Sequence, residues 1–135
     1  MAVGPVFALD SNSLIHALKG VGRVRQRLLA CDPRLISIPA VVAFEIEYGT
    51  LKAGNPERRR KELGLLLSTV RILPFDLRDA EIAARLRVEL EKRGEAIGQM
   101  DFMIAATALA NDCVLITNNR AEFSRVPKLR IEDWY

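Results

Sequence analysis

Short apolar runs alternate along this chain with longer stretches in which apolar residues recur every three or four positions. The short runs predict buried strands at residues 6–9, 35–38, 71–75 and 113–116, with a last short piece around 129–131. The helical spacing predicts helices over about residues 12–18, 21–29, 39–53, 63–70, 82–90 and 98–109. Strands that alternate with helices, without repeats or linkers, predict that residues 1–135 form one α/β domain with three layers, α/β/α. We expect a central, mostly parallel sheet of four to five strands.

Two prolines add detail to this arrangement. Pro39 directly follows the second strand, and we expect it at the first position of the next helix, where its missing N–H costs nothing. Pro74 falls inside the third predicted strand. Because proline cannot donate to a strand ladder, we expect this strand at an edge of the sheet.

Composition removes several classes of metal and nucleic-acid site. The chain holds one histidine, His16, and two cysteines, Cys31 and Cys113, with no CxxC motif, so a structural zinc site has no ligands to draw on. Apolar neighbours around both cysteines predict buried, reduced thiols. Aromatic residues make up only 6% of the chain, too few for the stacking platforms of many single-strand binders. Any metal must therefore be held by oxygen.

Localisation follows from what the chain does not contain. The first ten residues, MAVGPVFALD, lack a basic segment and are interrupted by Gly4 and Pro5, so they do not form a signal peptide. No window approaches the roughly 18 uninterrupted apolar residues of a membrane span. With reduced thiols expected as well, we predict a cytoplasmic protein with no membrane partner. The net charge of +3 suits a polyanionic partner but does not require one.

Polar side chains follow the first and fourth predicted strands. Asp10 comes directly after the first strand, and residues 117–119 (TNN) come after the fourth. Ligands of parallel α/β sheets bind beyond the carboxyl ends of the strands, which makes these residues candidates for a site. A helix N-cap, contributing about 1 kcal/mol, is the structural alternative for Asp10.

Two further acids lie where apolar residues are expected. Glu45 falls within the apolar stripe of the helix that follows Pro39, and Asp101 falls in the apolar row of the helix over residues 98–109. A buried carboxylate is costly unless a positive group pairs with it. The structural alternatives are a salt bridge with an arginine for Glu45 and a first-turn acid favoured by the helix dipole for Asp101.

One assumption explains all three acids together. Asp10, Glu45 and Asp101, with Asn119 and Glu122 nearby, would line a pocket for Mg²⁺, with Mn²⁺ able to substitute, because these ions prefer carboxylate and water ligands. A bound ion of this kind activates water and neutralises phosphodiester oxygens, which suits hydrolysis of a nucleic-acid backbone. No Ser/His/Asp set competes with this reading, since His16 is better explained as a structural or surface residue.

The same residues resemble the motifs of the PIN domain and, within it, of VapC-type toxins. The resemblance covers nearly the whole chain, through residues 7–12 (FALDSN), 37–39 (SIP) with 45–49 (EIEYG), 97–106 (IGQMDFMIAA), 115–123 (LITNNRAEF) and 129–134 (LRIEDW). Ser11 stands where the family usually has threonine, and Asn119 stands where many PIN domains have a fourth aspartate. We therefore expect one firmly bound ion, with Glu122 able to contribute through a water.

The resemblance implies a PIN-like fold and a Mg²⁺- or Mn²⁺-dependent endoribonuclease, the toxin of a type II toxin-antitoxin pair. It implies cleavage of structured RNA, tRNA above all, by metal-activated water and a consequent block of translation. A VapB-like antitoxin and a homodimer are the implied partners. The implied metal ligands are Asp10, Glu45 and Asp101, which with Asn119 make up the catalytic set. The residues expected to support that set are Ser11, Asn12, Thr117 and Glu122.

Surfaces for RNA and for the antitoxin are less clearly marked in the sequence. Arg58, Arg59, Arg60 and Lys61 form a basic run that predicts either a phosphate-tracking surface or, because Glu57 and Glu62 flank it, a solvated helix face. In such families the antitoxin tail lies across helices of the N-terminal half and can present an arginine to the acidic site. Groove residues for that tail would be Leu14, Leu18, Tyr48 and Leu51, although core packing explains them equally well.

Two other functions stay open at this level. A catalytically weak PIN-fold module that binds RNA or a partner would keep the fold, although the presence of all three acids argues against it. A phosphatase of the haloacid-dehalogenase type also begins with a strand that ends in aspartate. Its nucleophile is followed two residues later by a second aspartate, and Asn12 stands in that place here, which makes this function the less favoured.

Overall fold

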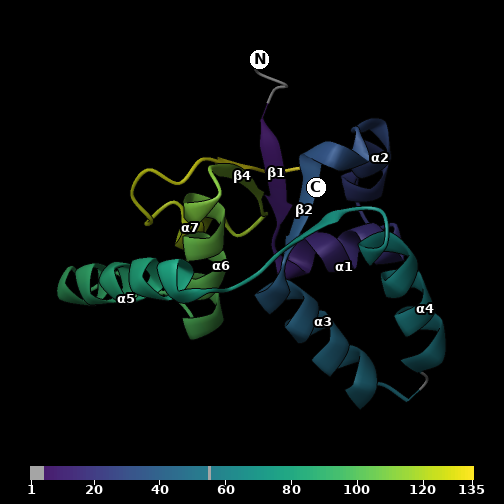
Figure 1. Cartoon of the computed structure of the whole chain (residues 1–135), viewed down its shortest axis with the longest axis horizontal. Coiled ribbons are helices and arrows are strands. Elements are labelled where there is room, and N and C mark those ends of the chain that lie inside the picture. The colour runs from purple at the N-terminus through teal and green to yellow at the C-terminus, as the bar shows by residue number, and fades with distance from the viewer. Residues whose placement is uncertain (1–4, 55) are drawn as a thin grey trace.

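All the predicted strands belong to one parallel sheet in the computed structural model, which describes residues 5–54 and 56–135 (Figure 1). Its order within the described residues is β3-β2-β1-β4-β5, and every neighbouring pair is parallel. The strands are β1 (Val6–Leu9), β2 (Ile36–Pro39), β3 (Arg71–Leu73), β4 (Cys113–Ile116) and β5 (Ile131–Glu132). The predicted sheet of four to five strands is confirmed, and β3 is an edge strand as Pro74 predicted.

The helices divide between the two sides of this sheet. They are α1 (Ser11–Lys19), α2 (Val24–Ala30), α3 (Ala40–Lys52), α4 (Pro56–Leu67), α5 (Leu77–Lys92), α6 (Gln99–Ala110) and α7 (Arg120–Phe123), with a short 3-10 helix, η1, at Pro33–Leu35. Figure 1 places α1 to α4 on one side of the strands and α5 to α7 on the other. The chain reverses its direction across the sheet after β3, so right-handed crossovers bring the later helices to the opposite face. The three-layer α/β/α architecture is thus confirmed.

Several predicted boundaries were wrong. Pro39 is the last residue of β2, paired in register with Leu73, and α3 begins one residue later at Ala40. The third strand ends at Leu73, so Pro74 follows it. The helix expected over residues 63–70 is α4, which begins at Pro56 and ends at Leu67. Because charged residues fill the first two turns of α4, apolar spacing alone marks only its second half.

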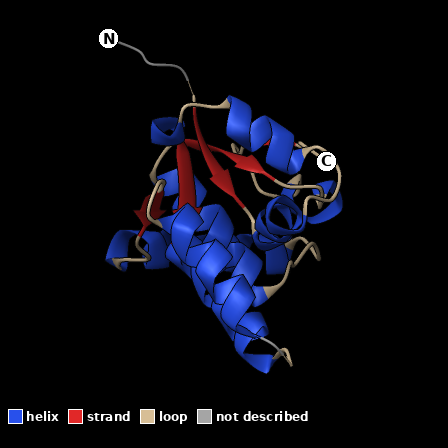
Figure 2. Ribbon diagram, turned by 90° about the vertical axis from the view of Figure 1, so that its right-hand side faces the viewer, coloured by secondary structure: helices blue, strands red, loops and turns tan. Residues whose placement is uncertain are grey.

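The core lies along the central strands and the helices that cover them. Every residue of β4 is buried, and Ile36 and Ile38 of β2 are almost fully buried. Trp134 closes the core near the C-terminal end of the chain, where its ring meets Phe7 edge-on at 5.0 Å between centroids. Figure 2 shows the strands enclosed between helices from a second direction. Apolar contacts on both faces of the sheet thus hold the strand ends in fixed relative positions.

Two findings concern the thiols and the membrane. Cys31 and Cys113 are both free, as predicted, but only Cys113 is buried, because Cys31 follows α2 at a half-exposed position. Burial raises the pKa of the Cys113 thiol. No helix of the described residues has the length and apolar character of a membrane span.

Candidate active site

The backbone pairing of β1 and β4 continues one residue beyond the carboxyl end of β1. The two strands pair in register from Val6 with Cys113 to Leu9 with Ile116. One residue further on, the Asp10 N–H donates to the carbonyl of Ile116 at 3.1 Å. The polar residues that follow both strands therefore lie at the same edge of the sheet, as expected for a parallel arrangement.

Asp10 is held in a defined position at this edge. It is the N-cap of α1, and its Oδ1 accepts a hydrogen bond from the Ser13 N–H at 2.8 Å. Only 4% of Asp10 is exposed. Ser13 is buried as well, and its hydroxyl donates to the Ile116 carbonyl at 2.9 Å. The N-cap alternative is thus correct for Oδ1 of Asp10. The second carboxylate oxygen, Oδ2, is left available to bind a ligand.

Glu45 reaches the same region from α3. Its Oε1 accepts a hydrogen bond of 2.5 Å from the hydroxyl of Ser11, the first residue of α1. None of the ion pairs among the described residues includes Glu45, so the alternative of a salt bridge with an arginine is not supported. Glu45 is half-buried at the margin of the apolar face, because Tyr48 and Gly49 farther along α3 are exposed. The predicted central position in a buried stripe was therefore wrong.

Asp101 lies in the first turn of α6 and is half-buried. Its carboxyl has a pKa raised to about 7, first of all because burial disfavours the charged form and then because of a hydrogen bond with Glu122. The negative charges of Glu122, Glu45 and Asp10 contribute smaller parts of the same pKa shift. The folded chain thus brings three acids from three other segments close enough to raise the pKa of Asp101.

Asn119 acts on this cluster through Glu122. Asn119 is the N-cap of α7, where its Oδ1 accepts from the Glu122 N–H at 3.4 Å and its Nδ2 donates to Glu122 Oε2 at 3.2 Å. The fully buried Thr117 supports the turn, since its Oγ1 accepts from the Asn119 N–H at 2.9 Å. The amide of Asn119 therefore orients the acid that hydrogen-bonds with Asp101.

The donor set suits a hard divalent cation. No three acidic, histidine or cysteine side chains within residues 5–54 and 56–135 form a ready-made set of metal ligands. Mg²⁺ is usually bound through one or two carboxylates and keeps several waters, so a complete protein cage is not needed. The pKa of Asp101 is raised mainly by burial and also by the negative charges of Glu122, Glu45 and Asp10, so a cation at this place would meet negative charge that its neighbours do not cancel. The residues present therefore fit Mg²⁺ or Mn²⁺, with Asp10, Glu45 and Asp101 as the available ligands.

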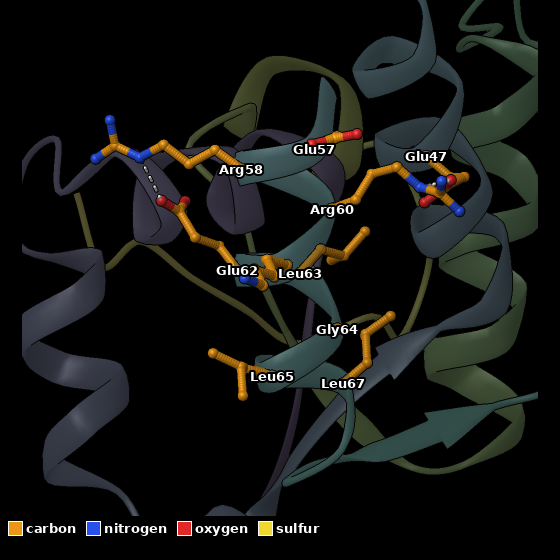
Figure 3. Close-up of a pocket in the computed structure, with 10 residues that line it drawn as sticks. Glu47, Glu57, Arg58, Arg60, Glu62, Leu63, Gly64, Leu65 and Leu67 are labelled. Atoms are coloured by element: carbon orange, nitrogen blue, oxygen red, sulfur yellow. Dashed lines mark hydrogen bonds and ion pairs between the residues drawn. The ribbon is translucent and has the colours of Figure 1, made fainter. Parts of the chain in front are cut away.

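The basic run on α4 does not act as one surface. Arg60 reaches across to α3 and pairs with Glu47 at 2.8 Å, as Figure 3 shows. Arg58 and Arg59 both turn toward Glu62, at 3.3 Å and 3.6 Å. The solvated-face interpretation thus explains Arg58 and Arg60, while Arg59 differs from them in its surroundings.

Arg59 and Glu45 line one groove of about 420 Å³ between α1, α3 and α4. Leu18 from the expected antitoxin groove lies in this lining, whereas Leu14 is fully buried in the core. Tyr48 and Leu51, the other two, are exposed on α3 and are not among the residues of the groove. The groove therefore leads away from Glu45 between α1 and α3, with Arg59 of α4 at its side.

Two of the residues considered in the sequence lie apart from the carboxylates, and two residues near the site were not predicted from the sequence. Asn12 is exposed on α1, and none of the hydrogen bonds among the described residues joins it to the acids. His16 packs against the ring of Tyr135 at 4.9 Å, away from the cluster. Ser13 was missed, because its bond to Asp10 uses the backbone N–H that any residue but proline would offer, and its hydroxyl meets the Ile116 carbonyl 103 residues away in sequence. Lys19, which lines the groove from α1, carries no signal in the sequence that marks it as a site residue.

Comparison with known proteins gives one family for nearly the whole chain. The model of the PIN domain matches residues 7–129. Ribonuclease VapC2 of Rickettsia felis is 34% identical over 131 residues, which cover 96% of this chain and 98% of the relative. The tRNA(fMet)-specific endonuclease VapC of Salmonella typhimurium is 34% identical over 129 residues, which cover 95% of this chain and 97% of that protein.

Solved structures agree with this result. The structure of DNA-bound VapBC from Salmonella typhimurium matches with a TM-score of 0.90 and 33% identity, covering 98% of this chain and 100% of that chain. VapBC2 from Rickettsia felis, bound to a DNA fragment from its promoter, matches with a TM-score of 0.88 and 32% identity, covering 96% of this chain and 99% of that one. The similarity thus extends over the full fold, including all the segments that carry the acids.

Proposed function

Because the chain belongs to the PIN domain family and, within it, to the VapC group, we propose that it is a metal-dependent endoribonuclease, the toxin of a toxin-antitoxin pair. The observation that carries this proposal is the meeting of Asp10, Glu45, Asp101 and Glu122 beyond the carboxyl ends of β1 and β4. Burial and the neighbouring acids together raise the pKa of Asp101 to about 7, and a half-buried group of acids of this kind favours a bound cation in place of a bound proton. Cleavage of a phosphodiester is the chemistry such a cation supports.

Asp10, Glu45 and Asp101 would hold the ion. A bound Mg²⁺ or Mn²⁺ supplies Lewis acidity, which makes water a better nucleophile and neutralises charge on the phosphate. Ser13 fixes one oxygen of Asp10, and Ser11 fixes one oxygen of Glu45, so each acid presents its other oxygen in a set direction. Asn119 orients Glu122 beside Asp101. These residues thus prepare the acids before the cation and the substrate arrive.

The substrate we propose is a structured RNA, with tRNA as the first candidate, and the consequence is a block of translation. Two relatives support this choice by their names. The proteins from Salmonella typhimurium and Shigella flexneri, each 34% identical to this chain, are tRNA(fMet)-specific endonucleases. A folded RNA offers exposed single-stranded loops that a shallow site can reach. The cytoplasm is the compartment that this substrate implies.

A VapB-like antitoxin is the partner we propose for control. The matching structures from Rickettsia felis and Salmonella typhimurium are VapBC complexes, which supports a partner of this kind. An antitoxin arginine at the acidic site would neutralise the same carboxylates that the ion needs, so inhibition and catalysis would compete for one site. The homodimer implied by the resemblance stays a prediction that analytical ultracentrifugation tests.

The test is cleavage of RNA by the purified chain with Mg²⁺, with Mn²⁺ and with EDTA. We expect cleavage of tRNA only with a metal ion, and mapping of new RNA ends after brief expression in cells should place the cuts in tRNA loops. Asp10→Asn, which keeps the shape of the N-cap, should remove the activity. Full cleavage by that variant would refute the site.

The alternative of a binding module gives a different result in the same assay. Such a module would bind RNA or its partner in a gel-shift experiment but would leave the RNA intact with either metal. The haloacid-dehalogenase alternative is not supported, because the family match over residues 7–129 is to the PIN domain.

A further inference from the structure

The groove between α1, α3 and α4 begins at the proposed active site. Glu45 belongs to its lining, together with Ile15, Leu18 and Ile46, which supply apolar surface, and with Lys19 and Arg59. A second, more polar hollow shares Leu18, Lys19 and Arg59 with it, so the two are continuous around the C-terminal end of α1. Four other hollows, including the large one in Figure 3, contain none of the acids of the cluster in their linings. An RNA strand bound at the carboxylates can therefore continue along this groove.

Two cations of the groove, Lys19 and Arg59, have little of their binding capacity used within the chain. Lys19 is exposed and forms no ion pair among the described residues. The Nη1 atom of Arg59 is buried and has no hydrogen-bond partner among those residues, since Glu62 Oε2 lies 3.6 Å away. A guanidinium nitrogen without a hydrogen bond is unfavourable and gains from an added acceptor. Within the part of the chain that the structure describes, Lys19 thus faces the groove from α1 without an ion pair, and Arg59 faces it from α4 with an Nη1 donor that has only a long ion pair with Glu62 and no hydrogen bond.

Two neighbouring arginines are occupied in other ways. The Nε of Arg25 donates to the Ala17 carbonyl at 2.7 Å, and its Nη2 donates to the Leu18 carbonyl, so this guanidinium caps the end of α1. Arg58 pairs with Glu62, and 89% of its side chain is exposed. The cationic character of the groove therefore depends mainly on Lys19 and Arg59.

Electrostatics shows why a ribonuclease needs such a pair. The acids that hold a cation repel the phosphates on either side of the one being cut, and a single ion compensates only the phosphate that it contacts. Cations beside the acids, rather than among them, can hold a flanking phosphate without displacing the ion. Lys19 and Arg59 occupy that place, because they share their groove with Glu45.

We propose that Lys19 and Arg59 bind backbone phosphates of the RNA on one side of the cleaved bond, with Ile15, Leu18 and Ile46 contacting the adjoining nucleotides. This inference rests on the proposed ribonuclease function and adds the path of the substrate. Both residues position the substrate and take no part in bond breaking. An acidic peptide segment would meet the same cations, but the direct continuity with a site for phosphodiester cleavage favours the RNA backbone.

The experiment compares two neighbouring arginines of α4. Arg59→Gln removes a cation of the groove, whereas Arg60→Gln removes the same charge from a residue paired with Glu47 on α3. Binding of a tRNA is measured in EDTA, which prevents cleavage, over a series of salt concentrations. We expect Arg59→Gln to weaken binding about tenfold and to reduce the salt slope by roughly one contact, with Arg60→Gln close to wild type. Lys19→Gln should act like Arg59→Gln, and Arg59→Lys should keep the slope.

Cleavage kinetics provides the second reading. With Mn²⁺, Arg59→Gln should raise KM and leave kcat within about twofold. The variant loses an RNA contact that the ground state and the transition state share, while the acids are unchanged. Equal salt slopes for wild type and Arg59→Gln, or equal losses for Arg59→Gln and Arg60→Gln, would overturn the inference. It would also be overturned if Arg59→Gln weakened only an acidic peptide or the antitoxin. If wild type binds tRNA but never cleaves it, the proposed function fails by itself, since the salt slopes in EDTA still report on the groove.

Discussion

The hydroxyl of Ser11 donates to Glu45 Oε1 at 2.5 Å, which joins the first turn of α1 to the middle of α3 across 34 residues of sequence. Ser11 directly follows Asp10, so one short segment supplies an acid of the site and also orients a second acid. A ligand held by a neighbouring hydrogen bond keeps its direction when the cation is absent. This bond therefore couples the two acids that come from the first half of the chain.

Removal of the Ser11 hydroxyl should weaken metal binding. Ser11→Ala leaves Glu45 without its donor, and we expect the affinity for Mn²⁺ to fall by about tenfold or more, as for other residues that orient metal ligands. Isothermal titration calorimetry measures this loss. Ser11→Thr keeps the hydroxyl and should bind Mn²⁺ like wild type. Equal affinities of Ser11→Ala and Ser11→Thr would show that the bond has no role in the site.

Neutralisation of Asp101 should separate activity from stability. Asp101→Asn removes a proposed ligand, and we expect RNA cleavage to fall by at least about a hundredfold. The same change removes a charge that Glu122, Glu45 and Asp10 oppose, so the metal-free protein should become more stable at pH 8. Glu81→Gln, at an exposed position on α5, should change neither property. Thermal unfolding in EDTA and a cleavage assay report the two effects, and a less stable Asp101→Asn variant would contradict this account.

The stability of the metal-free protein should depend on pH in a definite direction. The pKa of Asp101 is about 7 in the folded chain and 3.8 as its ordinary value, so the folded state binds more protons between these limits. The free energy of unfolding should therefore decrease as pH rises from about 4 to 7, on the order of 1–3 kcal/mol. Urea unfolding in EDTA at several pH values measures this decrease.

A control isolates Asp101 from the other titrating groups. The decrease should be smaller in Asp101→Asn, and added Mn²⁺ should reverse it in wild type, because the cation compensates the ionised carboxylates. Parallel pH profiles of the two proteins in EDTA would assign the dependence to other residues.

A matched pair of glycine substitutions tests how the C-terminal segment is packed. Gly22 has a φ of +65°, and a Cβ there would lie 2.9 Å from the ring of Tyr135. Gly22→Ala should therefore lower the free energy of unfolding by about 1–2 kcal/mol. Gly64 lies inside α4, where a Cβ would meet nothing within 4 Å, so Gly64→Ala should raise stability by up to about 1 kcal/mol. Urea unfolding of both variants checks the signs, and a neutral Gly22→Ala would show that Tyr135 moves aside easily.

The individual elements of this fold could be predicted from local patterns. The run at residues 113–116 is a buried strand because four consecutive apolar residues suit a parallel strand covered on both faces. Asp10 could be placed at the end of a strand for the same reason. The spacing of residues 58–67 was less informative, since charged residues fill the first turns of α4 and conceal where the helix begins. Helices and strands with a clear apolar period are thus determined locally, and their ends are less so.

Tertiary structure alone decided which polar residues meet. The raised pKa of Asp101 depends on its burial and on charges from α3 and from the segments after β1 and β4, which only the strand order β3-β2-β1-β4-β5 brings together. Arg59 and Arg60 are adjacent in sequence, yet successive helix residues point about 100° apart, so one lines the groove beside Glu45 and the other pairs with Glu47. The sequence by itself determined the acids and the elements that carry them. The packing of those elements determined which side chains share a site, because that depends on distances between segments far apart in the chain.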